Sequence, residues 1–335
     1  MKTLYLVTGA KGHLASTIIR ALRGKECLIR GFILPTEKAE DDLRVTYYHG
    51  DVTNEHSMDA FFSNAECYEV IVIHAAGIIS IDSKPSVNMR EVNVIGTQNV
   101  IDECRKHRVK RLVYVSSVHA IRENGDQVIC EATEFSPESV HGAYAKTKAE
   151  ASQLVLEADR CGLDTIIVHP SGIIGPYDDG RNHMVQMIQM ALKHKLPAGV
   201  TGGYDFVDVR DVALGCIAAA EIGQKGRCYI LSNCYITVRE LLDMVADKGG
   251  TAKLLSVPLP LAKMAAPFAE FYARCTHQRP LFTPYALETL SLKGRFSHDR
   301  ATSELGYHPR PIEDTVVDTI TYLRRLPCEY QEEQA

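Results

Sequence analysis

Short apolar runs alternate with amphipathic stretches of helical length along the first half of the chain, and this alternation constrains the fold more than any other feature. Strands are predicted at Leu4–Val7, Cys27–Leu34, Val45–Tyr48, Val70–Ala75, Arg111–Ser116 and Thr165–His169. Helices are predicted between them at 12–23, 55–63, 92–106 and 143–160. Several runs are apolar throughout, as expected of parallel strands covered on both faces. The pattern predicts an α/β fold with a doubly wound parallel sheet.

The pattern loosens after Pro176, which indicates a second, smaller unit. Further elements are predicted as a strand at Tyr204–Val209, a helix at Val212–Ile222 capped by Asp211, a strand at Cys228–Leu231, a helix at Val238–Asp247 opened by the Thr237/Glu240 capping box, and a C-terminal helix at Ile312–Leu326. We therefore predict a main domain at 1–176, to which 204–232 return. A smaller subdomain is predicted from 177–203 and 233–327, followed by a flexible tail at 328–335.

Composition excludes several classes of protein. The 335 residues carry a net charge of −5 with no Lys/Arg block, so nucleic acid is not expected as a partner. There is no secretory signal pattern at the N-terminus and no apolar run of about 18 residues, so neither export nor a membrane partner is predicted. The ten cysteines show no Cys-x-x-Cys spacing. We expect reduced thiols, no metal site and a cytoplasmic location.

A glycine-spaced turn, TGAKGHLA, directly follows the first predicted strand. Gly9 permits a tight turn, Gly12 lets the backbone approach a pyrophosphate, and Ala15 is small where helix meets strand. The N-terminus of the following helix offers free N–H groups to phosphates. This position predicts a dinucleotide-binding, Rossmann-type domain.

The choice between NAD and NADP stays open. An acidic residue near the end of the second strand would bind the ribose 2′-hydroxyl, and a basic one would accept a 2′-phosphate. This strand instead ends in Leu34 and Pro35, with Arg30 inside it and Lys38 beyond it. Asp51, in HGDVTN, is equally compatible with a contact to the adenine amine and with a turn or cap role.

Tyr144 and Lys148 lie four residues apart in AYAKTKAEA and so project from one helix face. A cation one turn away is expected to lower the pKa of the tyrosine toward a working range for proton transfer. Ser117 arrives at the carboxyl end of a neighbouring strand, where open α/β sheets place their ligands. We predict Tyr144 as general acid/base and Ser117 as the group that orients the substrate oxygen. Lys148 would tune the tyrosine and hold the cofactor ribose.

With these motifs the chain resembles the extended short-chain dehydrogenase/reductases of the NAD-dependent epimerase/dehydratase superfamily. The resemblance spans the whole length and includes HAAG at 74–77, NVIGTQN at 93–99, HPSGIIGP at 169–176 and FVDVRDVA at 206–213. It implies that HAAG passes the adenine ribose, that HPSGIIGP lies against the nicotinamide carboxamide, and that Asn93 supports the active-site helix. The resulting cofactor set is Gly9, Lys11, Gly12, His13, Leu14, Asp51, Val52, Ala75, Ala76, Gly77, Ser116, Tyr144, Lys148, Pro170, Gly172 and Ile173.

Within that branch the chain is most similar to the dihydroflavonol reductase and hydroxysteroid dehydrogenase group. This implies hydride transfer at a secondary alcohol or ketone of a small or medium, fairly apolar substrate. The alternative is a nucleotide-sugar epimerase with tightly bound NAD, which Arg181 and Arg279 keep open. Sugar dehydratases carry an Asp-Glu pair where Val118 and His119 follow Ser117, so that activity is disfavoured. Resemblance also implies a homodimer through the helices at 92–106 and 143–160.

Substrate contacts are predicted from loops near the nicotinamide side. His119, Tyr177 and His183 are the candidates, since loops on a rigid scaffold often carry function. Met184, Met187 and Met190 recur at helical spacing, which is typical of packing more than of a binding wall. The apolar stretch Pro258–Tyr272 is expected to cap the pocket.

Overall fold

The computed structural model describes residues 1–39, 42–80, 88–122, 128–178, 180, 182–275, 283–291 and 294–326, with backbone alone at 268–275. Arg181, Arg279 and the tail at 328–335 lie outside the described residues.

Seven parallel strands form the main sheet. They are β1 (Thr3–Thr8), β2 (Leu28–Ile33), β3 (Val45–His49), β4 (Glu69–His74), β5 (Arg111–Val115), β6 (Thr165–Pro170) and β10 (Cys228–Leu231). Their order is β10-β6-β5-β4-β1-β2-β3. The predicted doubly wound, Rossmann-type sheet is confirmed. The order reverses between β1 and β4, and a crevice for ligands is expected outside the carboxyl ends of the strands at that point.

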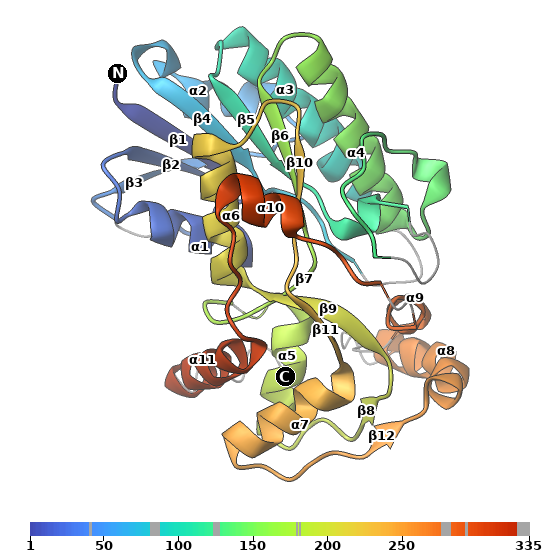
Figure 1. Cartoon of the computed structure of the whole chain (residues 1–335). Coiled ribbons are helices and arrows are strands. Elements are labelled where there is room, and N and C mark those ends of the chain that lie inside the picture. The colour runs from blue at the N-terminus through green and yellow to red at the C-terminus, as the bar shows by residue number, and fades with distance from the viewer. Residues whose placement is uncertain are drawn as a thin grey trace.

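Helices cover both faces of this sheet (Figure 1). The first face carries α1 (His13–Leu22), α6 (Val209–Ile222) and α10 (Asp299–Leu305). The opposite face carries α2 (Asp59–Phe62), α3 (Gly96–Lys106) and α4 (Ala143–Arg160). Successive strand side chains point to opposite faces, so Leu4 and Leu6 belong to the core under α3 and α4, whereas Tyr5 and Val7 belong to the core under α1 and α6. This explains why β1 is apolar at every position from Leu4 to Val7.

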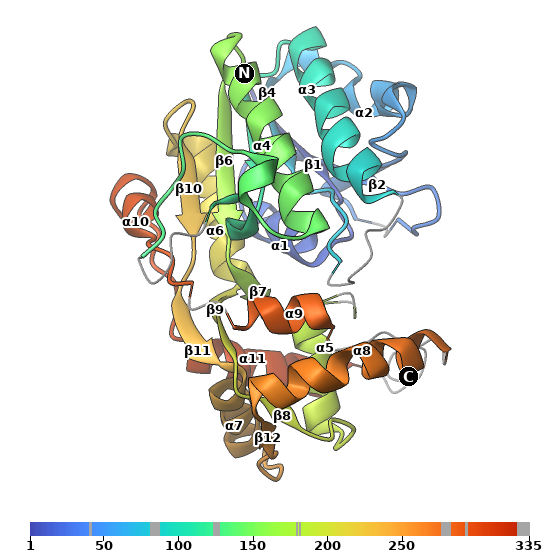
Figure 2. The same cartoon turned by 90° about the vertical axis from the view of Figure 1, so that its right-hand side faces the viewer.

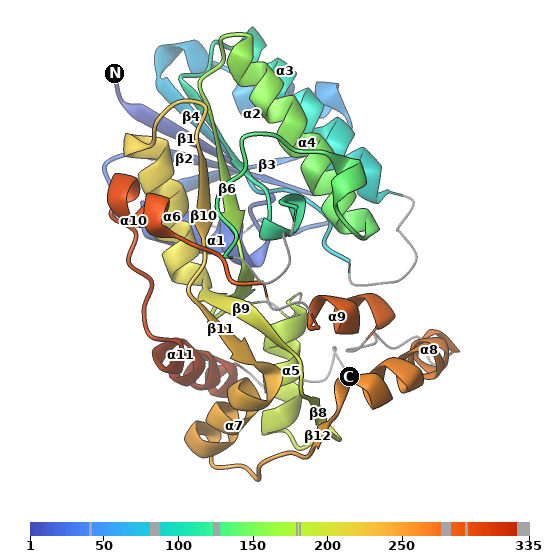
Figure 3. The same cartoon turned by 45° about the vertical axis from the view of Figure 1, so that its right-hand side comes forward.

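The smaller part of the molecule lies beyond the carboxyl ends of the main strands (Figures 2 and 3). It has a three-stranded sheet of β11 (Cys234–Thr237), β9 (Gly203–Asp208) and β7 (Gly172–Ile174), and a two-stranded one of β12 (Ser256–Val257) and β8 (Gly199–Val200). Its helices are α5 (His183–Leu192), α7 (Val238–Gly249), α8 (Leu259–Cys275), α9 (Pro284–Thr289) and α11 (Ile312–Arg325). A separate core joins α5, α7 and α11. The capping box that opens α7 is confirmed.

Three elements differ from the prediction. The helix expected at 55–63 is a 3₁₀ turn, Glu55–Met58, followed by the short α2. Helix α6 begins at Val209, because Asp208 and not Asp211 is its N-cap and accepts the Arg210 N–H. The Asp211 carboxylate is engaged by Arg310, whose backbone N–H and guanidinium both donate to it. The segment predicted as one helix at 92–106 starts with a π-helical turn, Glu91–Ile95, before α3. Of the residues 204–232, β10 joins the main sheet and β9 lies in the smaller one, and the domain boundaries stay a prediction.

Asp205 on β9 is a buried carboxylate, with a residue exposure of 2%. Its Oδ1 accepts the Asn233 N–H at 3.1 Å. Burial raises the pKa of Asp205 from 3.8 to about 6, and the nearby Ser171 side chain and the Asn233 N–H oppose this rise. The folded state therefore holds its proton up to about pH 6, while the unfolded chain releases it near 3.8. The associated stability is present below pH 3.8 and is lost as the pH rises through 6.

We predict that Asp205→Asn raises the free energy of unfolding at pH 7 by up to about 3 kcal/mol and changes it little at pH 4. Urea unfolding followed across this pH range measures the effect. The exposed Asp247→Asn is the matched control and should leave the pH profile unchanged. A loss of stability at pH 7 in Asp205→Asn would contradict the assignment of a destabilising buried charge.

Candidate active site

A cavity of about 830 Å³ lies at the carboxyl ends of the main strands, between the main sheet and the smaller part of the chain. The predicted site residues that line it are Gly12, His13, Leu14, Ala75, Gly77, Ser116, Ser117, His119, Tyr144, Lys148, Pro170, Gly172, Ile173 and His183. The cavity therefore brings the glycine turn, the HAAG and HPSGIIGP segments, and the three proposed catalytic groups to one space.

The glycine turn fits a pyrophosphate by its shape. Gly9 has φ +66°, and a Cβ there would lie 2.8 Å from the Ala76 Cα. At Gly12 a Cβ would lie 3.1 Å from the Gly9 carbonyl oxygen. Gly12 is also the N-cap of α1 and supplies no side chain to the first N–H groups of that helix. Those N–H groups form the kind of helix N-terminus that binds phosphates.

Gly77 leaves room in the cavity next to Asn93 and Lys148. It is exposed to the cavity, and a Cβ there would lie 3.2 Å from Asn93 Oδ1 and 3.5 Å from Lys148 Nζ. Asn93 binds the backbone of Ile78, the residue after Gly77. Its Oδ1 accepts the Ile78 N–H at 2.7 Å, and its Nδ2 donates to the Ile78 carbonyl at 3.0 Å. Asn93 Nδ2 also donates to Thr147 Oγ1 on α4 at 3.1 Å. Asn93 thus lies behind the cavity wall and ties it to the helix of Tyr144.

A buried hydrogen-bond chain joins the glycine turn to the π-helical turn. Thr97 Oγ1 donates to the Asn93 carbonyl at 2.7 Å, so it accepts from His74 Nε2–H at 3.1 Å. His74 Nδ1 then accepts from Thr8 Oγ1 at 2.7 Å, and the Thr8 oxygen accepts the N–H groups of Ala75 and Ala76. Burial, followed by the nearby Lys148, lowers the pKa of His74 to about 3. The ring is therefore neutral. The hydrogen-bond directions require this, because Nδ1 must be unprotonated to accept from Thr8.

Tyr144 and Lys148 stand in successive turns of α4, and both are buried. Burial raises the pKa of the Tyr144 phenol, and a hydrogen bond with the Ser117 side chain opposes the rise. Burial lowers the pKa of Lys148 from 10.5 to about 7. Its Nζ donates to the Val115 carbonyl at 2.7 Å and lies 3.4 Å from the Tyr114 hydroxyl. The structure thus differs from the predicted tuning: Ser117, and not Lys148, opposes the rise in the pKa of Tyr144, because the ammonium is directed toward the end of β5.

Two hydrogen bonds hold Ser117 just beyond the end of β5. Its carbonyl accepts from His169 Nδ1 at 3.0 Å, and its Oγ accepts the His119 N–H at 3.3 Å. Ser116 has a different role, since its Oγ lies 2.7 Å from Ser152 Oγ on α4. Ser152 donates to the Lys148 carbonyl, so Ser116 donates to Ser152 and secures the helix.

Seven predicted site residues do not line the cavity: Gly9, Lys11, Asp51, Val52, Ala76, Asn93 and Tyr177. Tyr177 was predicted to contact substrate, but its φ of +73° turns the ring between the Arg20 guanidinium, at 4.3 Å, and the Tyr322 ring, at 5.6 Å. The structure thus places Tyr177 outside the cavity lining, and its contact with substrate stays a prediction. Asp51 Oδ1 accepts the N–H and the Oγ1–H of Thr53 at 2.9 Å each, which matches the turn role weighed for it. Lys11 lies with Nζ 5.6 Å from the centre of the Tyr47 ring, beside β3.

The far wall of the cavity was largely missed from the sequence. It is formed by Met184, Met187, Tyr204, Phe206, Val238, Tyr285, Ala286, Thr289 and Leu290. The spacing of methionines on α5 was the one available signal. Met184 and Met187 line the cavity and also pack against the core of the smaller part. Tyr285, Ala286 and Thr289 of α9 line the cavity, and α8 packs against α9. None of the described side chains at 258–267 is among the lining residues, and a cap from 258–272 stays a prediction. The strand at 204–209 was predicted, but no sequence pattern indicates that side chains of β9 or α9 line the cavity, and the folded structure is needed to show it.

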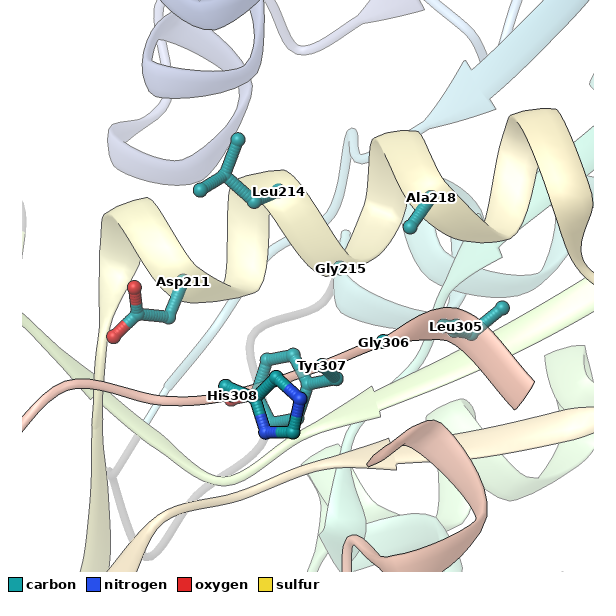
Figure 4. A pocket seen from close by; sticks show the side chains of 8 residues that line it. All are labelled: Asp211, Leu214, Gly215, Ala218, Leu305, Gly306, Tyr307 and His308. Atoms are coloured by element: carbon teal, nitrogen blue, oxygen red, sulfur yellow. The ribbon is translucent and has the colours of Figure 1, made fainter. Parts of the chain in front are cut away.

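A second hollow of about 190 Å³ lies on the outer face of α6 beside the turn after α10 (Figure 4). Leu214, Gly215 and Ala218 line one side, and Tyr307 and His308 line the other. Its carboxylate, Asp211, is already bound by Arg310, so this hollow offers no acid for catalysis.

Within the described parts of the chain, no three His, Cys, Asp or Glu side chains are arranged to hold a metal ion. None of the helices that can be examined has the length and apolar character needed to cross a bilayer.

Comparison with known proteins identifies the family. The model of the NAD dependent epimerase/dehydratase family matches residues 5–232. The chain belongs to this family. It is 30% identical to sterol demethylase protein B of Methylococcus capsulatus over 329 residues, covering 95% of this chain and 98% of that protein. Human 3 beta-hydroxysteroid dehydrogenase type 7 is 31% identical over 366 residues, with 96% of each chain covered.

The crystal structure of gox2253 superposes with a TM-score of 0.80 at 30% identity, over 96% of this chain and 98% of that one. The resemblance drawn from TGAKGHLA, YAKTK and the neighbouring motifs is therefore confirmed. The chain is an NAD(P)-dependent oxidoreductase of the extended short-chain dehydrogenase/reductase type.

We predict that Gly9→Ala weakens binding of the reduced nicotinamide nucleotide at least tenfold, because its Cβ would collide with backbone at Ala76. Gly250→Ala is the matched control, since Gly250 has φ +67° but no neighbour within 4 Å of a Cβ. That control should lose about 1 kcal/mol of stability and keep its affinity for the nucleotide. Nucleotide fluorescence titration gives the affinity. Equal affinities in the two variants would contradict a pyrophosphate at this turn.

Proposed function

We propose that the protein transfers a hydride between a nicotinamide nucleotide and a secondary alcohol or ketone, with Tyr144 as general acid/base. The observation that carries this proposal is the convergence of Tyr144, Ser117 and Lys148 on one cavity wall beside the glycine turn. A nucleotide at this turn would supply or take the hydride.

The protein groups divide the remaining work. Tyr144 donates its phenolic proton to a carbonyl oxygen during reduction and takes a proton from the alcohol during oxidation. His169 holds the Ser117 carbonyl, and the His119 N–H donates to the Ser117 Oγ. The Ser117 hydroxyl would aim at the same substrate oxygen and polarise it. Lys148, with a pKa of about 7, provides an ammonium for ribose hydroxyls. The α1 N-terminus supports the nucleotide phosphates.

The wall opposite the catalytic groups supports an apolar substrate of medium size. It presents Met184, Met187, Phe206, Val238 and Leu290, and burial of such surface favours apolar ligands by about 25 cal/mol per Å². The names of the relatives from Methylococcus and human point to sterol and hydroxysteroid chemistry. We therefore propose a sterol-like or similarly apolar alcohol as the substrate.

A nucleotide-sugar epimerase is the competing proposal. Among the residues whose placement is described, Lys148 is the one Lys or Arg in the cavity lining, and it stands beside Tyr144. A sugar diphosphate would need further cationic partners on the far wall. The apolar character of that wall favours the dehydrogenase.

For the cofactor we propose NAD in preference to NADP. The Glu37 carboxylate folds back onto the end of β2, where its Oε2 accepts the Leu34 N–H at 2.9 Å. It places negative charge where an adenosine 2′-hydroxyl is bound in such sheets, and it would repel a 2′-phosphate. Arg30 is directed elsewhere, since its Nη1 donates to the Phe61 and Ser63 carbonyls at 2.9 and 2.7 Å.

Glu37→Gln should therefore lower the ratio of NAD to NADP affinity by about tenfold, since one charge-assisted contact and one repulsion are removed. Binding titrations with both nucleotides measure the ratio. Glu55→Gln, exposed after β3, is the control and should keep the ratio. Tighter binding of NADP than of NAD by the unmodified protein would contradict the proposal.

The homodimer through α3 and α4 and the cytoplasmic location stay predictions. Sedimentation at micromolar concentration tests the first, and fractionation of the source cells tests the second.

Tyr144→Phe should reduce turnover by about 10²- to 10⁴-fold with little change in nucleotide affinity, because only the proton-transfer hydroxyl is lost. Initial rates with a 3-hydroxysteroid and NAD, together with nucleotide titration, separate the two effects. Retention of more than half of the activity would remove Tyr144 from its role.

A further inference from the structure

Two side chains join the glycine turn of the main part to helix α5 of the smaller part. His13 is the first residue of α1, and Asn182 is the N-cap of α5. They are 169 residues apart in the sequence, yet His13 Nδ1 and Asn182 Nδ2 are 3.2 Å apart. Both residues line the cavity. The nucleotide side of the cavity therefore meets the substrate side through a direct side-chain contact.

The amide of Asn182 uses its oxygen and its nitrogen for different elements. Its Oδ1 accepts the N–H groups of Met184 and Val185, at 2.9 and 3.3 Å, and so caps α5. The oxygen is thereby identified, and Nδ2 is the donor. Nδ2 donates to the Ile173 carbonyl at 2.8 Å and to His13 Nδ1. One amide thus fixes the start of α5 to both β7 and α1.

The imidazole of His13 is used at both nitrogens. Because Asn182 donates to Nδ1, the ring proton is on Nε2, which donates to the Pro176 carbonyl at 2.8 Å. The backbone N–H of His13 belongs to the first turn of α1, the part of a helix that binds phosphates. One residue therefore faces the nucleotide site with its backbone and the smaller part of the chain with its side chain.

The residues just after Pro176 attach to the same helix a second time. The Tyr177 ring lies between the Arg20 guanidinium of α1 and the Tyr322 ring of α11. The Tyr322 hydroxyl donates to the Asp178 carbonyl at 3.4 Å, and the Asp178 carboxylate accepts the Asn182 N–H at 3.2 Å. The N-cap of α5 therefore cannot shift away from α1 without breaking several contacts.

We propose that His13 is a positioning residue that couples nucleotide binding to the shape of the substrate wall. A diphosphate that fixes the first turn of α1 also fixes the His13 ring. Through Asn182 it then orders the start of α5, which places Met184 and Met187 in the cavity wall. The service of this wall to a substrate rests on the proposed function, whereas the coupling between α1 and α5 needs only nucleotide binding.

The test measures the order of α5 when ADP binds. ADP carries the adenosine and the diphosphate but no nicotinamide, so it does not fill the space beside Met184 and Met187. The readout is deuterium exchange, followed by mass spectrometry, at the amides of Met184 and Val185, which Asn182 caps. We expect saturating ADP to slow this exchange about fivefold, the lower end of typical coupling between two sites.

Two variants break the connection at opposite ends. His13→Leu removes both side-chain hydrogen bonds and keeps the backbone N–H, and Asn182→Ser keeps a capping oxygen but is too short to reach His13. Both should still bind ADP, and exchange at the start of α5 should then be equal with and without it. His13→Gln, which has a donor and an acceptor, should restore part of the effect.

Ser16→Ala is the matched control on α1. It removes one hydrogen bond, from Ser16 Oγ to the His13 carbonyl at 3.2 Å, and should keep the full slowing. Equal exchange with and without bound ADP in the parent would overturn the coupling, as would full slowing in both His13→Leu and Asn182→Ser. Failure of the parent to bind ADP would overturn the nucleotide site and the coupling together. Failure of the proposed hydride transfer would appear instead in steroid turnover, on which this measurement does not depend.

Discussion

The neutral His74 ring is the interaction on which the rest of the site depends. It connects Thr8 at the end of β1 with Thr97 on α3, and through them it fixes the Ala75–Ala76 backbone and the Asn93 carbonyl. They belong to three chain segments, which are Thr8 on β1, residues 74–76 at the end of β4 and residues 93–97, and these lie at or behind the cavity wall. Each proton in this hydrogen-bond network has one acceptor. A charged His74 would carry a second N–H in place of the acceptor that Thr8 uses, which would leave a donor unsatisfied in the core. The low pKa of His74 keeps the ring neutral, and the neutral ring maintains the hydrogen bonds that fix the backbone behind the cavity.

The π-helical turn at Glu91–Ile95 follows from the same arrangement. A π turn is rare and is frequently found at functional sites. Here it contains Asn93, whose amide bonds both the backbone of Ile78 and the Thr147 hydroxyl on α4. The helix that carries Tyr144 and Lys148 is thus positioned relative to the backbone that would pass the nucleotide ribose. The position of Tyr144 and Lys148 on α4 is thus coupled to the π-helical turn that precedes α3.

Much of the main domain could be predicted from the sequence because its signals are local. Strand and helix alternate with distinct periods, the glycine turn has a fixed place after β1, and the Tyr144/Lys148 spacing needs only helical geometry. The errors have physical causes as well. Asp208 replaced Asp211 as the cap of α6 because Arg310, 99 residues from Asp211 in the sequence, engages its carboxylate. Tyr177 lies outside the cavity lining and packs against Arg20 and Tyr322, long-range contacts that no local pattern announces. The wall residues Tyr204 and Tyr285 gain their role only through tertiary contacts.

The central claim is that the three groups at the end of β5 and on α4 serve net hydride transfer to an apolar carbonyl. The most direct measurement is transfer of label from a reduced nicotinamide nucleotide deuterated at carbon 4 to a 3-ketosteroid. The account predicts deuterium at the new carbinol carbon, with stoichiometric loss of the reduced-nucleotide absorbance. Interconversion of UDP-sugars without net change in that absorbance, and no label in the steroid, would contradict it.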